Sequence, residues 1–184
     1  MPKMPIKSHR LVSANFIESP NQSARPADGR INLLVIHNIS LPPGEFGGDS
    51  IMRLFCNTLN CSAHPYFRGL EGLRVSAHVL IRRNGDIMQF VPFNRKAWHA
   101  GRSSFEGIEN CNDFSIGVEL EGTDHDPFTD SQYAALTQLT RDLLATYPGL
   151  TEARIVGHSD IAPGRKSDPG PCFDWDRYRR SLRS

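Results

Sequence analysis

One short segment constrains the fold of this chain most, the apolar run Ile31-Asn32-Leu33-Leu34-Val35-Ile36. Aliphatic and β-branched residues follow one another there with little polar alternation, as is typical of a strand buried within a sheet. The run ends at His37-Asn38, and residues 41–48 are so rich in proline and glycine that we expect a loop. The segment therefore predicts a buried central strand that ends in polar residues.

The rest of the chain alternates strand-like and helix-like patterns. Asn84-Gly85 stands between two β-rich runs and predicts a hairpin. Thr129 and Gln132 have the spacing of a capping box before a helix that stops at Tyr147-Pro148-Gly149. The other expected elements are strands at 75–81, 87–91, 115–121 and 154–157, a helix at about 51–59, a last helix capped by Asp174, and loops at 60–74, 92–114 and 159–172.

Strands that alternate with helices, with one hairpin among them, predict an α/β fold. We expect a central mixed β-sheet flanked by helices. A length of 184 residues suits one domain. We assign this domain to residues 31–184 and interpret the polar, proline-interrupted residues 1–30 as an N-terminal arm.

Charge and composition exclude several classes of protein. With 21 Lys+Arg against 20 Asp+Glu, the chain lacks the basic excess of a dedicated nucleic-acid binder. No stretch approaches the ~20 apolar residues of a membrane span, and the N-terminus lacks the apolar core of a secretory signal. The four cysteines form no Cys-x-x-Cys pair, so we expect reduced thiols and a cytoplasmic protein, although a processed mature protein would look the same.

Two of the seven histidines share one context. His37 and His158 each end an apolar β run and precede a loop rich in proline or glycine, and strand ends are where α/β domains place their sites. Asp168 lies further along the loop after His158. Two imidazoles and one carboxylate form a catalytic zinc set whose fourth position is left to water. Spacing alone favours the alternative, in which the histidines are structural and Asp168 caps a turn.

Longer motifs around these residues favour the zinc site over the structural alternative. The chain contains, in order, VIHNISLPPGEFGG, HPYF, LRVSAHVLIRRNG, AWHAG, NDFSIGVELEG and GHSDIAPGRKSDPGP. Together they resemble the type 2 N-acetylmuramoyl-L-alanine amidases, a family related to bacteriophage lysozyme-type amidases and peptidoglycan recognition proteins. The resemblance covers about residues 31–178, and the segments VIHNISLPPGEFGG, ELEGTD and RKSDPGP match its cytoplasmic peptidoglycan-recycling branch.

The resemblance implies a fold of that family and a zinc amidase with one Zn²⁺ per chain. By position in the motifs, His37, His158 and Asp168 match the three zinc ligands. The implied reaction is hydrolysis of the amide between 1,6-anhydro-N-acetylmuramic acid and L-alanine of the stem peptide. The implied partner is a soluble anhydro-muropeptide. We expect a monomer that binds neither nucleic acid nor membrane.

Two further residues match catalytic positions of the family. Glu119 matches the carboxylate that takes a proton from water and delivers it to the leaving nitrogen. Strand alternation puts Glu121 on the same face, so the residues alone do not choose between the two carboxylates. Lys166 matches the residue that stabilises the oxyanion, and in an extended loop it points the same way as Asp168. Arg165 beside it is expected on the surface.

The chain departs from the wider family at two positions. Phage-type members carry a tyrosine where this chain has Ala77, so a tyrosine-assisted mechanism is excluded there. Many relatives use cysteine as the third ligand where this chain has Asp168. Because a carboxylate is a harder ligand than a thiolate, we expect zinc to be held less tightly.

Substrate contacts follow less directly from the motifs. Asn38 and Arg74 match positions that contact the muropeptide, and a guanidinium can grip the carboxylates of the stem peptide. Tyr66 and Trp98 are candidates for apolar walls beside the sugar, with ordinary packing as the alternative. We expect the remaining motif histidines, His64, His78 and His99, to be structural.

Two other functions compete with the recycling amidase. A module that binds muropeptide without cutting it is disfavoured, because all ligand and catalytic positions are filled. An exported or phage-type amidase that acts on the intact wall has no support from a signal segment or an appended wall-binding domain.

Overall fold

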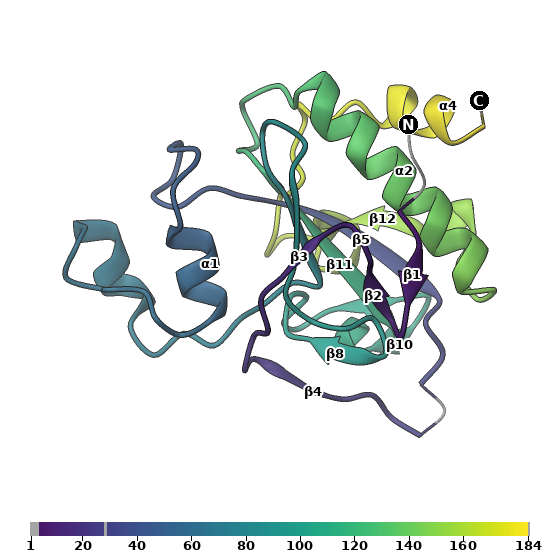
Figure 1. Ribbon diagram of the computed structural model, residues 1–184, viewed down its shortest axis with the longest axis horizontal. Helices are drawn as coiled ribbons and strands as arrows, with labels where there is room; N and C mark the ends of the chain where they lie inside the picture. The colour runs from purple at the N-terminus through teal and green to yellow at the C-terminus, as the bar shows by residue number, and fades with distance from the viewer. Residues whose placement is uncertain (1–3, 28, 184) are drawn as a thin grey trace.

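The structure, a computed structural model, describes residues 4–27 and 29–183. At its centre is a six-stranded sheet, in which β5 is parallel to both β12 and β11, β11 is parallel to β6, and β6 is antiparallel to β7 (Figure 1). The predicted α/β fold with a mixed sheet is confirmed. The strands, in spatial order, are β12 (Ile155–Gly157), β5 (Leu33–Ile39), β11 (Ser115–Glu121), β6 (Val79–Ile81), β7 (Ile87–Gln89) and β3 (Asn15–Phe16).

β5 is the buried central strand that the apolar run predicts, but it is longer than expected. Its ladder with β11 continues through the pairs Glu119↔His37 and Leu120↔Asn38. His37 therefore lies within the strand, where the sheet fixes its backbone. The register also places it directly beside Glu119.

β11 has the expected alternation and is buried throughout. Ile116, Val118 and Leu120 belong to the largest apolar core. The side chains in between, Ser115, Gly117, Glu119 and Glu121, lie on the opposite face. One strand thus separates the core from the polar side of the sheet.

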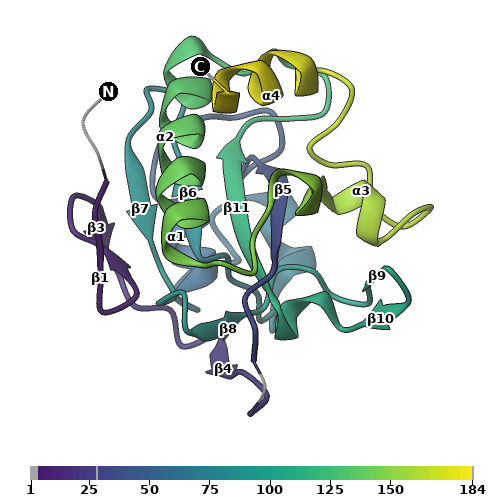
Figure 2. The same ribbon diagram turned by 90° about the vertical axis from the view of Figure 1, so that its right-hand side faces the viewer.

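The core face of the sheet is covered by α2 (Asp130–Thr146), with α4 (Trp175–Arg183) packed beside it (Figure 2). The capping box is confirmed: Thr129 Oγ1 accepts from the Gln132 amide, and Gln132 Oε1 accepts from the Thr129 amide, both at 3.1 Å. The Asp174 cap is confirmed as well, since its Oδ1 accepts from the Arg177 amide at 2.8 Å.

A second apolar core lies on the other face. It joins α1 (Ser50–Phe55) and the 3₁₀ helix η1 (Pro65–Leu70) to Leu80 and Phe90 of the hairpin region. Figure 1 shows α1 and its neighbouring loops projecting from one side of the sheet. The helix is shorter than the predicted 51–59 because the chain turns at Asn57, where φ is +59°.

The predicted hairpin joins β6 to β7, with Gly85 at φ +89° and its amide bonded to Arg82 O. The regular ladder begins at Val79 rather than residue 75. Ser76 bonds instead to Trp98 O, and the His78 amide bonds to Gly117 O. The segment before β6 thus links two loops and the centre of β11.

The regions expected to be an arm and a loop contain short strands. β3 adds an edge to the main sheet, β4 pairs with β8, and Leu11 enters the largest core. Strands of two or three residues are too short to show a periodicity in sequence. These elements are β1 (Ile6–Lys7), β2 (Arg10–Leu11), β4 (Gln22–Ala24), β8 (Arg95–Ala97), β9 (Ser104–Phe105), β10 (Ile108–Glu109) and the 3₁₀ helix η2 (Cys111–Asp113).

The parallel strands β5 and β12 bring their carboxyl ends to the same edge. The 3₁₀ helix η3 (Glu152–Arg154) precedes β12, and the short helix α3 (His158–Ile161) follows it, at the start of the segment expected to be a loop. Within the part of the chain that the structure describes, no helix combines the length and apolar character needed to cross a bilayer.

Candidate metal centre

Three side chains meet at the carboxyl edge of the sheet. His37 comes from β5, His158 from the first residue of α3, and Asp168 from the following loop. The two Nδ1 atoms lie 3.0 Å apart, and each lies 3.0 Å from Asp168 Oδ2. The sheet register and one loop therefore converge three ligand atoms on a single point.

The hydrogen bonds of His158 show what kind of group fits there. Its Nε2 lies 3.0 Å from the carbonyl oxygen of Ala100, which can only accept, so Nε2 carries the hydrogen and Nδ1 presents a lone pair in the neutral ring. A lone pair that faces a carboxylate oxygen requires a cation or a proton between them. Ligand atoms around a tetrahedral Zn²⁺ lie about 3.3 Å apart, close to the spacing observed. The donor set fits zinc.

The surroundings of His37 and Asp168 favour the protonation states that bind a metal. Burial lowers the pKa of His37 to about 4, so its ring is neutral near pH 7. Burial alone would raise the pKa of Asp168, but the adjacent imidazoles of His158 and His37 outweigh this and hold that pKa well below its usual range. Metal ligands must be deprotonated, and these shifts favour the deprotonated forms of His37 and Asp168.

Glu119 is buried on the same face of the sheet. Burial, reinforced by the nearby Asp168 carboxylate, raises its pKa well above the usual value, while Lys166 acts in the opposite direction. Its Oε2 has no hydrogen-bond partner among the described residues. An unpaired buried oxygen is costly unless another molecule satisfies it.

Glu121 has the opposite environment. Its Oε1 accepts from Arg82 Nη1 at 2.8 Å and from the Gly47 amide at 2.7 Å, and its Oε2 accepts from the Arg83 amide at 3.2 Å. This carboxylate ties loops together and leaves no oxygen unpaired. The geometry thus separates two residues that alternation could not distinguish.

The ligands and Glu119 line a cavity of about 680 Å³. Lys166 and Arg165 line it as well, and both are exposed, as expected for Arg165. Arg165 also donates to Ala100 O at 2.6 Å and so holds the loop that bonds His158. Basic and acidic groups occupy one part of the wall, and apolar residues supply another, namely Leu41, Leu54, Leu70, Leu73 and Val75.

A family model described as N-acetylmuramoyl-L-alanine amidase matches residues 27–171. The chain belongs to this amidase family.

Individual relatives agree over nearly the whole chain. The 1,6-anhydro-N-acetylmuramyl-L-alanine amidase AmpD of Salmonella typhimurium strain SL1344 is 56% identical over 169 residues, which cover 92% of this chain and 90% of the relative. A crystal structure of a selenomethionine AmpD derivative matches with a TM-score of 0.95 and 54% identity, covering 97% of this chain and 99% of that one. The expected enzyme class, an amidase, is confirmed.

A more distant structure contains a ligand. The amidase AmiD of Escherichia coli, solved with anhydro-N-acetylmuramic acid-L-Ala-D-γ-Glu-L-Lys, has a TM-score of 0.62 and 32% identity. The match covers 86% of this chain and 58% of that one. The type 2 amidase fold expected from the motifs is therefore confirmed.

The residues expected to contact substrate lie in different settings in this amidase. Tyr66 and Trp98 line the cavity. Asn38 lines it too, but its amide hydrogens go to Asp124 Oδ1 at 2.7 Å and Pro169 O at 3.0 Å. Arg74 is exposed and donates to the adjacent Leu73 O at 3.3 Å, outside the described residues that line the cavity.

The sequence analysis expected His99 to be structural and did not include it in the site. Its Nδ1 lies 2.9 Å from His37 Nε2, and its ring lines the cavity. Burial lowers the pKa of His99 well below the usual value. Its position in the AWHAG motif was the available signal.

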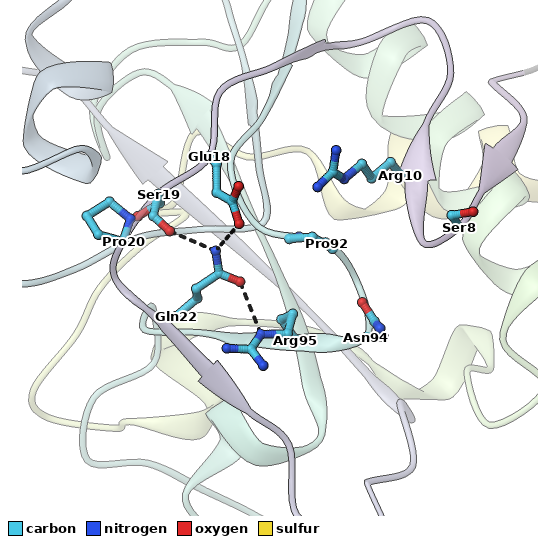
Figure 3. Close-up of a pocket in the computed structure, with 9 residues that line it drawn as sticks. All are labelled: Ser8, Arg10, Glu18, Ser19, Pro20, Gln22, Pro92, Asn94 and Arg95. Atoms are coloured by element: carbon cyan, nitrogen blue, oxygen red, sulfur yellow. Dashed lines mark hydrogen bonds between the residues drawn. The ribbon is translucent and has the colours of Figure 1, made fainter.

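The amidase also has a larger cavity, of about 870 Å³, between the N-terminal segment and the β7–β8 connection (Figure 3). Three of its polar side chains pair with one another: Gln22 Nε2 donates to Glu18 Oε1 at 3.1 Å, and Arg95 Nε donates to Gln22 Oε1 at 3.2 Å. The triad that could hold a metal lines the smaller cavity, so chemistry rather than size points to the candidate site.

Proposed function

We propose that this amidase uses Zn²⁺, held by His37, His158 and Asp168, to hydrolyse the amide between 1,6-anhydro-N-acetylmuramic acid and L-alanine of the stem peptide. The observation that carries the zinc site is the triangle of ligand atoms at 3.0 Å. The substrate class is supported by the name of the AmpD relative and by the ligand of the AmiD complex.

The chemistry requires three contributions, because an amide is a poor electrophile with a poor leaving group. When bound, Zn²⁺ supplies Lewis acidity and brings the pKa of water toward neutrality. Glu119 is the base that accepts a proton from the attacking water and then delivers it to the leaving nitrogen. Its unpaired Oε2 and raised pKa suit a group that first takes up a proton and then releases it.

Lys166 supplies the positive charge for the carbonyl oxygen as it becomes an oxyanion. The side chain lies on the cavity wall, near enough to His37 and Glu119 for its charge to lower both their pKa values. A charge already in position costs no reorganisation during the reaction, which makes it effective.

We propose Tyr66 and Trp98 as apolar walls for the sugar. Both amide hydrogens of Asn38 are occupied, so its carbonyl oxygen is the atom available to substrate. Arg74 is proposed to meet the stem-peptide carboxylates from outside the cavity, where its exposed guanidinium can reach a ligand that protrudes.

The cellular setting is proposed to be the cytoplasm, where released wall fragments are recycled. The four cysteines lie unpaired in the described part of the chain, as suits a reducing compartment. We propose that the enzyme is a monomer, with residues 31–184 as one zinc amidase domain and residues 1–30 as an arm against it. The few exposed large apolar side chains in the described residues, such as Val12, Phe46 and Ile108, come from separate segments.

Substrate form tests the recycling role. Soluble anhydro-muropeptide and insoluble sacculi are offered at equal concentrations of stem peptide, and the released peptides are quantified by mass spectrometry. We expect the soluble fragment to be cut far faster, because the site is sized for a small ligand. Equal rates would indicate a wall-lytic amidase, and tight binding without cleavage would indicate a recognition module.

A further inference from the structure

His99 lies between His37, a proposed zinc ligand on β5, and Ser115 of β11. Its Nδ1 faces His37 Nε2 at 2.9 Å, and its Nε2 faces Ser115 Oγ at 3.0 Å. Both ring nitrogens are thus engaged, and the half-buried side chain lies at the cavity wall. The imidazole is held at both ends, in line with His37.

Residues of β11 and Asn112 make room for this ring and hold its backbone in place. An added Cβ at Gly117 would overlap His99 Cγ, so only glycine leaves room at that position of β11. Asn112 Oδ1 accepts from the backbone amides of His99 at 3.1 Å and Ala100 at 2.8 Å. The alternating face of β11 therefore presents Ser115 as partner, Gly117 as space and Glu119 as the unpaired carboxyl.

The direction of the hydrogen bonds follows from the metal site. His37 Nδ1 faces the other two ligand atoms, so it must offer a lone pair, and the hydrogen must stand on Nε2. His37 Nε2 then donates to His99 Nδ1, and His99 Nε2 donates to Ser115 Oγ. In the reverse arrangement Ser115 donates to His99, His99 donates to His37, and the hydrogen on His37 Nδ1 blocks the metal.

We infer that His99, seated on Gly117 and Ser115, is a positioning residue that holds His37 in the tautomer and ring orientation that bind Zn²⁺. This inference rests on the proposed zinc site. His158 is held in its tautomer by a backbone carbonyl, Ala100 O, which can only accept a hydrogen bond. An imidazole partner is different, because it can donate or accept, and its orientation needs the support of β11. Partners of this kind commonly contribute 10- to 100-fold in metal affinity.

Zinc affinity of folded protein tests the inference. The dissociation constant is measured by competition with a chromogenic chelator for the wild type, His99→Ala, Gly117→Ala and Ser115→Ala. We expect His99→Ala and Gly117→Ala to weaken binding by about 10- to 100-fold, and Ser115→Ala to weaken it by less. His99→Asn places an acceptor oxygen near the position of Nδ1 and should restore part of the affinity.

Thr140→Val is the matched control. It removes a buried hydrogen bond between Thr140 Oγ1 and Tyr178 Oη, which lie 2.6 Å apart on the far face of the sheet. It should lower stability and leave zinc affinity unchanged. A role of His99 in stability alone would make His99→Ala behave in the same way.

The outcomes separate this inference from the proposed function. If the wild type takes up no zinc, the proposed metal site fails, and the inference fails with it. If the wild type binds zinc and the folded His99→Ala and Gly117→Ala proteins bind it equally well, only the inference is overturned. If these variants do not fold, nitrogen NMR of zinc-loaded wild type decides: a hydrogen on His99 Nε2 supports the relay, and one on Nδ1 overturns it.

Discussion

Two carboxylates on one strand face show how surroundings assign roles to single residues. Glu121 is neutralised by Arg82 and two backbone amides, whereas Glu119 has a raised pKa and an oxygen without a partner among the described residues. A buried carboxyl held this way costs stability and is a common mark of a functional group. Its cost is consistent with a role in proton transfer.

Glu119→Gln should lower the turnover number by about 10²- to 10⁴-fold, the usual contribution of a general base. Zinc content should stay unchanged, because Glu119 is not among the three ligands. The measurement is steady-state hydrolysis of anhydro-muropeptide together with metal analysis. Glu121→Gln is the control, which should lose stability and retain turnover. Full turnover by Glu119→Gln would remove this residue from the mechanism.

At this scale the sequence predicted much of the candidate site. Strand-end context and motif position together nominated His37, His158 and Asp168, and the structure brings their ligand atoms together. Alternation could not choose between the two glutamates, because the choice depends on partners from distant loops. His99 was placed with the structural histidines, since nothing in its neighbours along the chain reveals a contact with His37 across 62 positions.

At the scale of elements, the site depends on how strand ends are fixed. α2 is tied to the sheet through its capping box: Thr129 Oγ1 also donates to Arg83 O at 2.6 Å, and Gln132 Nε2 donates to Glu121 O at 2.9 Å. The two cap residues thus satisfy a backbone amide at the start of α2 and also two backbone carbonyls, one just after β6 and one at the end of β11.

Thr129→Ala should lower the free energy of unfolding by about 1–2 kcal/mol, toward the upper end for a lost N-cap. The reason is that one hydroxyl both accepts from the Gln132 amide and donates to Arg83 O. Denaturant unfolding provides the measurement. Thr146→Ala, at an exposed position near the other end of α2, should change little. Equal losses from both substitutions would contradict the role of the cap.

The long elements were predictable because their patterns are long enough to read. The central run, the alternation of β11, the hairpin at Asn84-Gly85 and the cap of α2 all appear as expected. The strands within residues 1–30 and 92–114 were not, because each spans only two or three residues. Some of them also depend on distant pairing, as in β4 with β8.

For the molecule as a whole, buried neutral histidines make the fold sensitive to acid. Burial lowers the pKa of His37 to about 4 and that of His78 to about 3, from 6.5. Below pH 6.5 the unfolded chain takes up protons that the folded protein does not, so stability is lost as the pH falls. Glu119 acts oppositely, because its raised pKa favours the folded form at low pH.

We therefore expect metal-free Glu119→Gln, which lacks this opposing carboxyl, to lose free energy of unfolding steadily between pH 6.5 and about 4. Urea unfolding at closely spaced pH values measures the slope. The wild type should show a shallower dependence over the same range. A flat profile in the variant would mean that the buried histidines gain protons without unfolding.

The most direct test of the account is cleavage of anhydro-N-acetylmuramyl-L-Ala-D-γ-Glu-L-Lys, followed by mass spectrometry, with zinc-loaded, chelator-stripped and zinc-restored enzyme. We predict complete conversion to 1,6-anhydro-N-acetylmuramic acid and free peptide by the loaded enzyme, none after stripping, and recovery when zinc returns. His158→Ala should not recover. Undiminished cleavage by enzyme shown to be free of metal would contradict the zinc mechanism.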